Sequence, residues 1–140
     1  MKRRRRTEIL IQGDCSLARS FAKTIVDSYE CREIVAPQYG LTMIKMRESA
    51  KNSLFYIGEV LVTEAKVEIE KRIGIGIVVG MQDELAKHLA IIDAAYKAKL
   101  PETARWKAQL IEEEHNIIKH RAKEQAELFE TKVRFETMEV

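Results

Sequence analysis

One stretch of the chain, residues 54–95, changes its hydrophobic period part-way along and so constrains the fold more than any other. Apolar residues first recur at every second position, which is the period of strands with one buried face. Two runs share this pattern: Leu61, Ala65, Val67 and Ile69, then Ile73, Ile75, Ile77 and Val79. The charged residues 70–72 between them indicate a hairpin turn. After Gly80 the spacing becomes helical, so we predict that a helix over residues 81–98 lies across the apolar face of a hairpin.

Further helices are predicted on both sides of this stretch. Residues 3–12 form a short helix, and residues 17–29 form a second one whose four-residue apolar spacing gives it a role in the core. A long, highly charged helix is predicted from Glu102 to Glu130. Its apolar stripe is too narrow for full burial, so we expect it to project or to pack on another subunit.

Two more strands are predicted before the hairpin, over residues 31–36 and 41–47, because Pro37 cannot donate to a sheet ladder. The polar residues 48–53 form a loop, and residues 131–140 return to a strand-like pattern. The predicted fold class is therefore α+β, in a single domain over residues 1–140. It has an antiparallel sheet of four to five strands, N-terminal helices, one helix packed on the sheet and a long C-terminal helix.

The composition, 46% apolar and 33% charged residues, is typical of a water-soluble globular protein. Its apolar runs fall short of the roughly 18 residues that a membrane span needs. The basic residues near the N-terminus are not followed by the apolar segment of a secretory signal. Cys15 and Cys31 lack the paired spacing of a zinc site and are expected to be free thiols. These features predict a cytoplasmic protein without a membrane partner.

The segment Lys2–Arg6 places five positive charges at one end of a chain whose net charge is only +2. Clustered Lys and Arg bind phosphates, so a small nucleic-acid-binding module is one functional hypothesis. The body is not basic, however, and no aromatic residues are interleaved for base stacking, which makes a nucleic-acid partner the weaker hypothesis. A solvated, partly frayed helix terminus is favoured, and docking on an acidic patch of a protein partner is a third possibility.

The segment just before the predicted helix contains three glycines, Gly74, Gly76 and Gly80. A phosphate-binding loop is one interpretation of them. The spacing matches neither of the common glycine-rich phosphate motifs, and the first two glycines fall inside an alternating strand. Glycine in a strand more often marks a bulge or a close backbone approach, which we favour here. The start of the next helix keeps anion binding open as an alternative, although Asp83 there would repel an anion.

Two acids stand out because of their neighbours. Asp93 lies among isoleucines and alanines, where a carboxylate is costly unless it is paired or hydrogen-bonded. It either holds an Arg or a backbone group of a partner or bonds within its own domain, and the two are weighed equally. Glu59, beside Gly58 in the run IGEVLVTEA, is open to the same two interpretations.

The residues show no self-sufficient active site, and we assign no catalytic residue. Glu112 and His115 have the spacing that di-iron bundles use, but the other carboxylates and the second pair are missing. A charged helix face is the better interpretation, and no metal site is predicted. No Ser–His–Asp or Cys–His arrangement can be argued either, which favours a role as a subunit.

Six segments of the chain carry a family resemblance through their order and spacing. They are residues 6–10 (RTEIL), residues 40–43 (GLTM), LFYIGEVLVTEAKV from Leu54, GIGIVVG from Gly74, AIIDAA from Ala90, and residues 132–138 (KVRFETM). Together they resemble the PhnG family, a subunit of the bacterial carbon–phosphorus lyase system, over nearly the whole chain. The matching family segment also has Asp at the position of Asp93.

The resemblance implies a subunit of the carbon–phosphorus lyase core complex. With PhnH, PhnI and PhnL, the family takes part in displacing adenine from MgATP by an alkylphosphonate such as methylphosphonate. The product is α-D-ribose 1-methylphosphonate 5-triphosphate, whose carbon–phosphorus bond PhnJ then breaks. The implied partners are thus PhnI-, PhnJ-, PhnH- and PhnL-like proteins in a hetero-oligomer. MgATP is the substrate of the complex, and no cofactor is expected to be bound by this chain.

Interface residues are predicted from apolar side chains in charged surroundings. Val60 and Val62 interrupt the polar face of the hairpin, and Trp106 and Ile118 lie on the narrow stripe of the long helix. We expect replacement of Trp106 with Ala, or of Ile118 with Lys, to weaken partner binding while the sheet stays folded. The opposite outcome would mean that this helix serves the core of its own domain.

Overall fold

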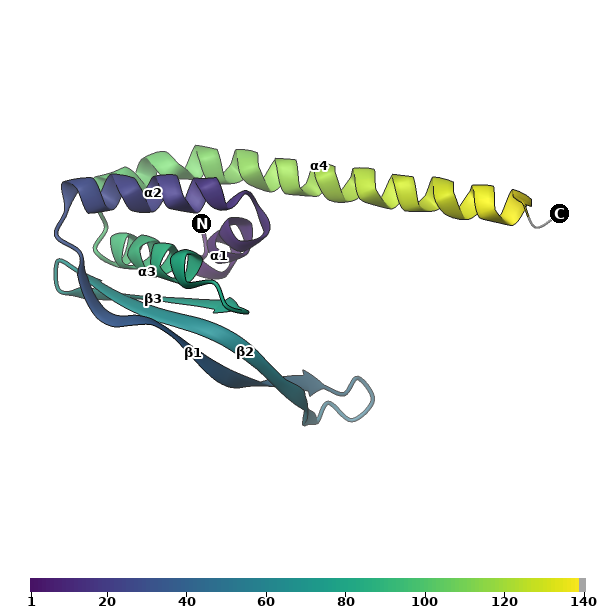
Figure 1. Cartoon of the computed structure of the whole chain (residues 1–140), viewed down its shortest axis with the longest axis horizontal. Helices are drawn as coiled ribbons and strands as arrows, with labels where there is room; N and C mark the ends of the chain where they lie inside the picture. The colour runs from purple at the N-terminus through teal and green to yellow at the C-terminus, as the bar shows by residue number, and fades with distance from the viewer. Residues whose placement is uncertain (139–140) are drawn as a thin grey trace.

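The computed structural model describes residues 1–138, which fold into four helices and a three-stranded sheet (Figure 1). In chain order the elements are α1 (Arg3–Gln12), α2 (Cys15–Ser28), β1 (Arg32–Arg47), β2 (Leu54–Ile69), β3 (Arg72–Val79), α3 (Asp83–Lys97) and α4 (Pro101–Met138). This arrangement confirms the α+β class, the two N-terminal helices and the long C-terminal helix. No helix within residues 1–138 combines the length and the apolar character needed to cross a membrane.

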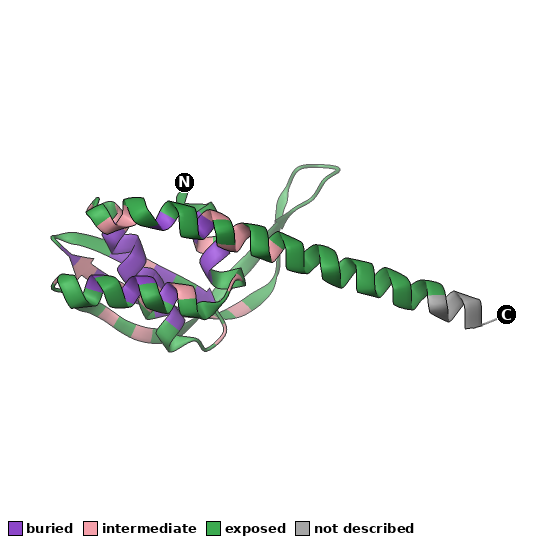
Figure 2. Ribbon diagram, turned by 90° about the horizontal axis from the view of Figure 1, so that it is seen from above, coloured by how far each residue is buried: buried purple, intermediate pink, exposed green. Residues whose placement is uncertain are grey.

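The elements form layers, with α3 in the middle. The sheet lies on one side of α3, while α2 and the first turns of α4 lie on the other and α1 packs alongside (Figure 1). Nine of the 15 residues of α3 are buried, so this helix is enclosed on most of its circumference (Figure 2). The apolar period after Gly80 therefore predicted the helix and its place on the sheet.

The strands follow one another as an antiparallel meander in the order β1-β2-β3. The turn between β2 and β3 consists of Glu70 and Lys71, whose φ angles of 48° and 66° fit a tight two-residue hairpin turn with the twist of its strands. Residues 48–53 form the loop between β1 and β2. The predicted hairpin and the predicted loop are both confirmed.

The sheet has three strands among the described residues, fewer than the predicted four to five. β1 runs without a break through Pro37, with register shifts on both sides of Val35. Pro37 is tolerated because β1 is the edge strand, where a missing N–H need not interrupt a ladder. The strand predicted for residues 131–140 is also wrong: α4 continues to Met138, and residues 139–140 lie outside the described part.

The apolar face of β3 was assigned wrongly. Ile73, Ile77 and Val79 are 45%, 51% and 61% exposed, whereas Gly74, Gly76 and Val78 are the buried residues of this strand. They continue the buried face of β2, whose members are Thr63, Ala65, Val67 and Ile69. The isoleucines therefore lie on the open face of the sheet, together with the charged residues of β2.

Helix packing builds the rest of the core. Asp14 caps α2 by accepting a hydrogen bond from the Ser16 backbone N–H at 3.0 Å. Phe21 of α2 stacks on Trp106 of α4, with ring centroids 4.5 Å apart and planes 9° from parallel. Leu110, one turn further along α4, is fully buried. The first part of α4 therefore belongs to the body of the domain.

Candidate functional site

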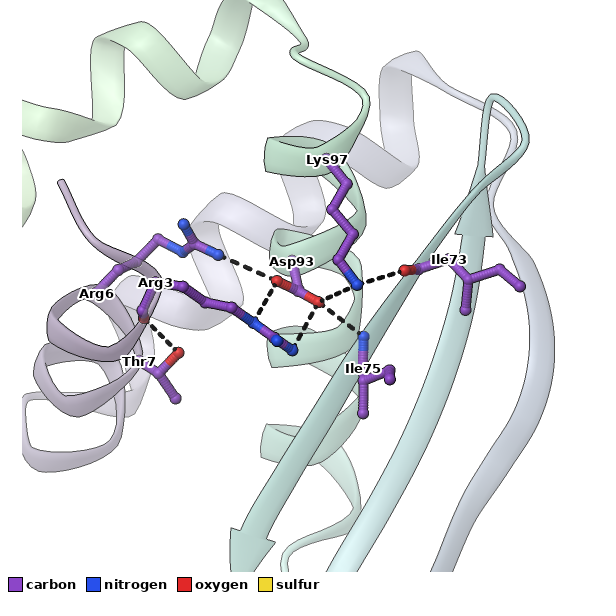
Figure 3. Close-up of polar contacts among 7 residues, drawn as sticks. All are labelled: Arg3, Arg6, Thr7, Ile73, Ile75, Asp93 and Lys97. Atoms are coloured by element: carbon purple, nitrogen blue, oxygen red, sulfur yellow. Dashed lines mark hydrogen bonds and ion pairs between the residues drawn. The ribbon is translucent and has the colours of Figure 1, made fainter.

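The first candidate site is centred on Asp93 of α3, a buried carboxylate with four partners (Figure 3). Arg3 approaches both of its oxygens, at 3.0 and 3.1 Å, and Arg6 contacts Oδ1 at 3.1 Å. Lys97 lies 3.2 Å from Oδ2. The Ile75 backbone N–H donates to the same oxygen at 3.0 Å. Asp93 thus joins α1, α3 and β3. This matches the interpretation that its carboxylate bonds within its own domain.

Arg6 is the most enclosed partner of this carboxylate. Its side chain is 7% exposed, and its guanidinium lies 3.8 Å from the centroid of the Tyr96 ring, a cation–π arrangement. Burial lowers the pKa of Arg6, while the nearby Tyr96 and Asp93 act in the opposite direction. Arginine stays protonated under all ordinary conditions, so the net effect is a fixed charge held in a buried pair.

The remaining N-terminal arginines also have acidic partners in this domain. Arg4 pairs with Glu8 at 3.1 Å, and Arg5 pairs with Glu114 of α4 at 2.6 Å. The hydrogen bond from Arg5 lowers the pKa of Glu114. The terminus is solvated as expected, since residues 1–5 are exposed, but it is not frayed, because α1 begins at Arg3 and packs against α3 and α4.

A groove of about 490 Å³ lies beside this cluster, between α1, α3 and β3. Most of its lining is apolar, and most of the rest is charged. The apolar residues are Leu10, Ile11, Ile75, Ile77, Leu89 and Ile92, and the charged ones are Arg3, Arg4, Arg6, Glu8 and Asp93. Because the three arginines are paired with Asp93 and Glu8, they hold no charge free for an anion.

The glycines of β3 make room for α3. A Cβ built on Gly74 would overlap the backbone of Ala90 and Ala94, and one on Gly76 would overlap that of Ala86 and Ala90. The backbones of β3 and α3 are therefore in direct contact, as expected for strand glycines that mark a close backbone approach. The structure gives these two glycines no phosphate-binding role.

The turn into α3 depends on Gly80 and a buried threonine. Gly80 has a φ of +87°, a conformation that favours glycine. Thr63 donates to the Gly80 carbonyl at 2.6 Å and accepts from the Gln82 backbone N–H at 3.0 Å. At the same helix end, the Tyr39 hydroxyl donates to Asp83 at 2.7 Å, which raises the pKa of Tyr39. Thr63 therefore fixes the turn that leads into α3, and Asp83 in the first turn of the helix is held by Tyr39.

The second candidate site is an extended two-stranded ribbon that we call the hairpin arm, residues 41–61. It projects from the body beyond the end of β3 (Figure 1). Gly58 and Glu59 both lie on it and are exposed. Its large apolar side chains are also exposed, by 36% to 68%: Leu41, Met43, Ile44, Met46, Leu54, Phe55, Tyr56, Ile57 and Leu61. Exposed apolar side chains in this number are typical of an interaction site.

The long helix α4 changes character along its length. Trp106, expected to face a partner, is only 4% exposed and belongs to the core. Ile118 is 57% exposed, and beyond it Leu128 and Phe129 are exposed by 70% and 67%. The outer part of α4 thus presents apolar side chains to solvent, as the hairpin arm does.

The total accessible surface is large because the hairpin arm and the outer part of α4 project from the body. The chain exposes 10188 Å², whereas a compact monomer of 16.2 kDa exposes about 7,500 Å² on the usual scaling with mass. The difference resembles the area that one subunit contributes to a large permanent interface.

The model of a protein family described as "Phosphonate metabolism protein PhnG" matches residues 1–139 of this chain. The chain belongs to the PhnG family. The match covers essentially the whole sequence and confirms the resemblance seen in its segments. A comparison with curated proteins gave no match. Family membership places the protein in phosphonate metabolism, as a subunit of the carbon–phosphorus lyase system.

Sequence reasoning found part of these sites. It singled out Asp93, Gly58 and Glu59, but it missed the arginine partners of Asp93, which lie about 90 positions away in the chain. It also missed Thr63, a polar residue at an inward position of an apolar strand. That position was the available signal, because a buried hydroxyl needs hydrogen-bond partners.

Proposed function

We propose that this PhnG-family chain is a subunit of the carbon–phosphorus lyase core complex. In that role it acts with PhnH-, PhnI- and PhnL-like proteins to form α-D-ribose 1-methylphosphonate 5-triphosphate from MgATP and methylphosphonate, with release of adenine. A PhnJ-like protein then breaks the carbon–phosphorus bond. Family membership supports the choice of system, and the shape of the chain supports the role of a subunit.

The observation that carries the subunit role is the surplus of accessible surface. About a quarter of the 10188 Å² exceeds what a compact monomer of this mass exposes. Large apolar side chains are exposed on the hairpin arm and, among many charged ones, on the outer part of α4. At about 25 cal/mol per Å², covering even 400 Å² of apolar surface contributes on the order of 10 kcal/mol before the costs of association.

Within this proposal the chain has a structural or site-completing role beside the PhnI-like protein. No residue is assigned to catalysis, no cofactor is assigned to this chain, and MgATP is a substrate of the complex. The buried network around Asp93 ties α1 and β3 to α3 within the body of the domain.

The alternative of a nucleic-acid-binding module finds little support in the geometry. Arg3, Arg4, Arg5 and Arg6 are all paired with acids of the same domain. Binding phosphates with them would mean breaking these pairs. We expect weak retention of nucleic acid in a filter-binding assay across salt concentrations. Strong, steeply salt-dependent binding that disappears when Lys2–Arg6 is neutralised would favour this alternative instead.

Genetic complementation tests the proposal. A bacterium that lacks its own PhnG-family gene is supplied with this chain together with the PhnH-, PhnI-, PhnJ- and PhnL-like proteins of the same source. Growth on methylphosphonate as the sole phosphorus source is expected, and so is co-purification of the chain with the PhnI-like protein. The same strain without the chain is the control. Equal growth in both strains, with no co-purification, would overturn the proposal.

A further inference from the structure

The hairpin arm has an open strand edge that begins where β3 ends. The last contact across this edge is the hydrogen bond from the Gly80 backbone N–H to the Leu61 carbonyl, 2.8 Å long. From Leu61 back to Leu54, β2 has β1 on one side and, within residues 1–138, no strand on the other. The open edge is therefore eight residues long and continues the line along which β3 pairs with β2.

The direction of the backbone groups follows from this hydrogen bond. In an antiparallel strand the backbone N–H and C=O groups of successive residues point to alternate sides. Because the Leu61 carbonyl points toward β3, the backbone groups of Val60 point toward β1 and those of Glu59 point toward the open edge. The N–H and C=O of Glu59 are thus available to another strand. Its cross-strand neighbour Met43 points its own backbone groups the opposite way, toward the outer edge of β1.

The two edges of the ribbon differ where they meet the body of the domain. There the outer edge of β1 contains Pro37, and the β1–β2 register shifts on both sides of Val35. A proline and irregular pairing both hinder strand addition, so a strand added outside β1 could not run on along the body. Within the arm the one register shift, near Gly58, is shared by β1 and β2, and the open edge of β2 is in line with β3. Phe55 and Tyr56, on opposite faces of the strand, are 44% and 62% exposed.

We propose that the open edge of β2, residues 54–61, accepts a β-strand of a partner chain that continues the sheet in line with β3. The inference rests on the proposed function, because the partner is another subunit of the same system. The added strand has about eight residues, apolar side chains on both faces and a Lys or Arg beside Glu59. It hydrogen-bonds to the free backbone groups and covers apolar surface on both sides of the arm.

Charge favours a different chain over a second copy of this one. Glu59 is the one charged residue among residues 54–61, so pairing of this segment with itself supplies no cation for either carboxylate. Both copies of Glu59 would then lie among apolar side chains without a counter-charge, which is costly. The surplus surface is also of the size that a permanent hetero-complex covers.

Proline substitutions on the two edges test the inference. Glu59→Pro removes an N–H at the open edge of β2 and leaves the ladder with β1 intact, whereas Met43→Pro does the same at the outer edge of β1. Each full-length variant is co-expressed with the PhnH-, PhnI-, PhnJ- and PhnL-like subunits, and its affinity for the co-purifying subunit is measured. We expect Glu59→Pro to weaken binding at least tenfold and Met43→Pro to change it less than threefold.

Each other result has a distinct meaning. If the wild type binds a subunit and both variants keep this binding, or both lose it equally, strand addition at β2 is overturned. The proposed function then still stands. Absence of wild-type binding to any subunit overturns the proposed function itself. A wild-type homodimer that Glu59→Pro dissociates shows a second copy at the edge and overturns the choice of partner.

Backbone hydrogen exchange gives an independent reading on the unmodified protein. On complex formation the Glu59 amide should slow by at least tenfold, while the Met43 amide should change little. Unchanged exchange at Glu59 in a complex that does form would overturn the inference, even if a proline variant failed to fold.

Discussion

The two halves of β2 both carry apolar side chains but have opposite surroundings. In the half beneath α3, the inward side chains of Ala65, Val67 and Ile69 are at most 2% exposed. In the half that forms the hairpin arm, residues Leu54 to Ile57 are 44% to 62% exposed. The same strand is thus exposed to solvent in its first half and part of the core in its second half. Apolar character alone does not distinguish the two uses, because both halves carry it.

The long helix shows the same contrast. Trp106 and Leu110 are buried, and Trp106 packs on aromatic rings of α2 and α3, whereas Ile118 and Phe129 are mostly exposed. Substitutions in the body should therefore lower the stability of the isolated chain, and substitutions in the projections should not. The expected loss of stability decreases from substitutions in the core to substitutions in the exposed parts.

Trp106→Ala should have the largest effect. It removes a buried indole that stacks on Phe21 and contacts Tyr96 at a centroid distance of 5.8 Å. Truncations of this kind cost about 3–5 kcal/mol of unfolding free energy. Urea denaturation of the isolated chain measures the loss, with Ile118→Ala in the same helix as the control, expected within about 0.5 kcal/mol. Similar losses for both variants would contradict the division of α4 into a buried and a projecting part.

Asp93→Asn should come next. An amide of nearly the same size keeps the packing but leaves the buried Arg6 without its counter-charge. Removing one member of a buried pair costs about 3–5 kcal/mol, and we expect the lower end because Arg3 and Lys97 are partly solvated. Thermal and urea unfolding measure the effect. Glu114→Gln, which breaks an exposed pair with Arg5, is the control and should change stability far less.

Gly76→Ala should destabilise the chain by about 2 kcal/mol, because the new methyl group overlaps the backbone of α3 and forces β3 away from it. Gly40→Ala is the matched control on the same sheet, since a Cβ there meets no atom within 4 Å. Unfolding in urea compares the two. A neutral Gly76→Ala would show that α3 can shift at no cost and that the close packing is not required.

His88 should give a smaller, pH-dependent effect. Burial lowers the pKa of His88 from 6.5, with Arg19 and Lys87 acting in the same direction and Glu84 opposing them. The folded state therefore binds the proton less readily than the unfolded state, so stability falls as the pH drops below about 6.5. His88→Gln should lose less stability between pH 7.5 and pH 5.5 than the wild type. Equal losses in the two proteins would contradict this assignment.

Local pattern predicted the elements whose signals lie within a few residues. The four-residue spacing of Phe21 and Ile25 predicted α2, and residues 70–72 predicted a tight turn. Pro37 misled the strand count because its effect depends on whether a strand lies at an edge. That depends on the whole sheet, which no local window contains.

The face of β3 and the partners of Asp93 required information from distant segments. In β3 the period-two rule selected Ile73 and Ile77 as buried, but α3 presents the small residues Ala86, Ala90 and Ala94 to the sheet. A backbone in direct contact needs glycine opposite it, so the glycine side of the strand faces inward. Likewise, the sequence indicated that Asp93 needs partners, while only the packing of α1 on α3 brings the arginines to it.

The smallest expected effect on stability belongs to the hairpin arm and sharpens the comparison most. Ile57→Ser changes a side chain that is 53% exposed, and Val67→Ser changes one that is 2% exposed on the same strand. In the isolated chain the first should alter the unfolding free energy by less than about 0.5 kcal/mol. The second should cost about 2–4 kcal/mol, through the lost burial and the buried hydroxyl. Ile57→Ser should also weaken co-purification of the chain with the PhnI-like protein, since it removes apolar surface from the hairpin arm. If Ile57→Ser unfolded the chain as readily as Val67→Ser, the arm would be part of the domain core and its role as a partner-facing surface would fail.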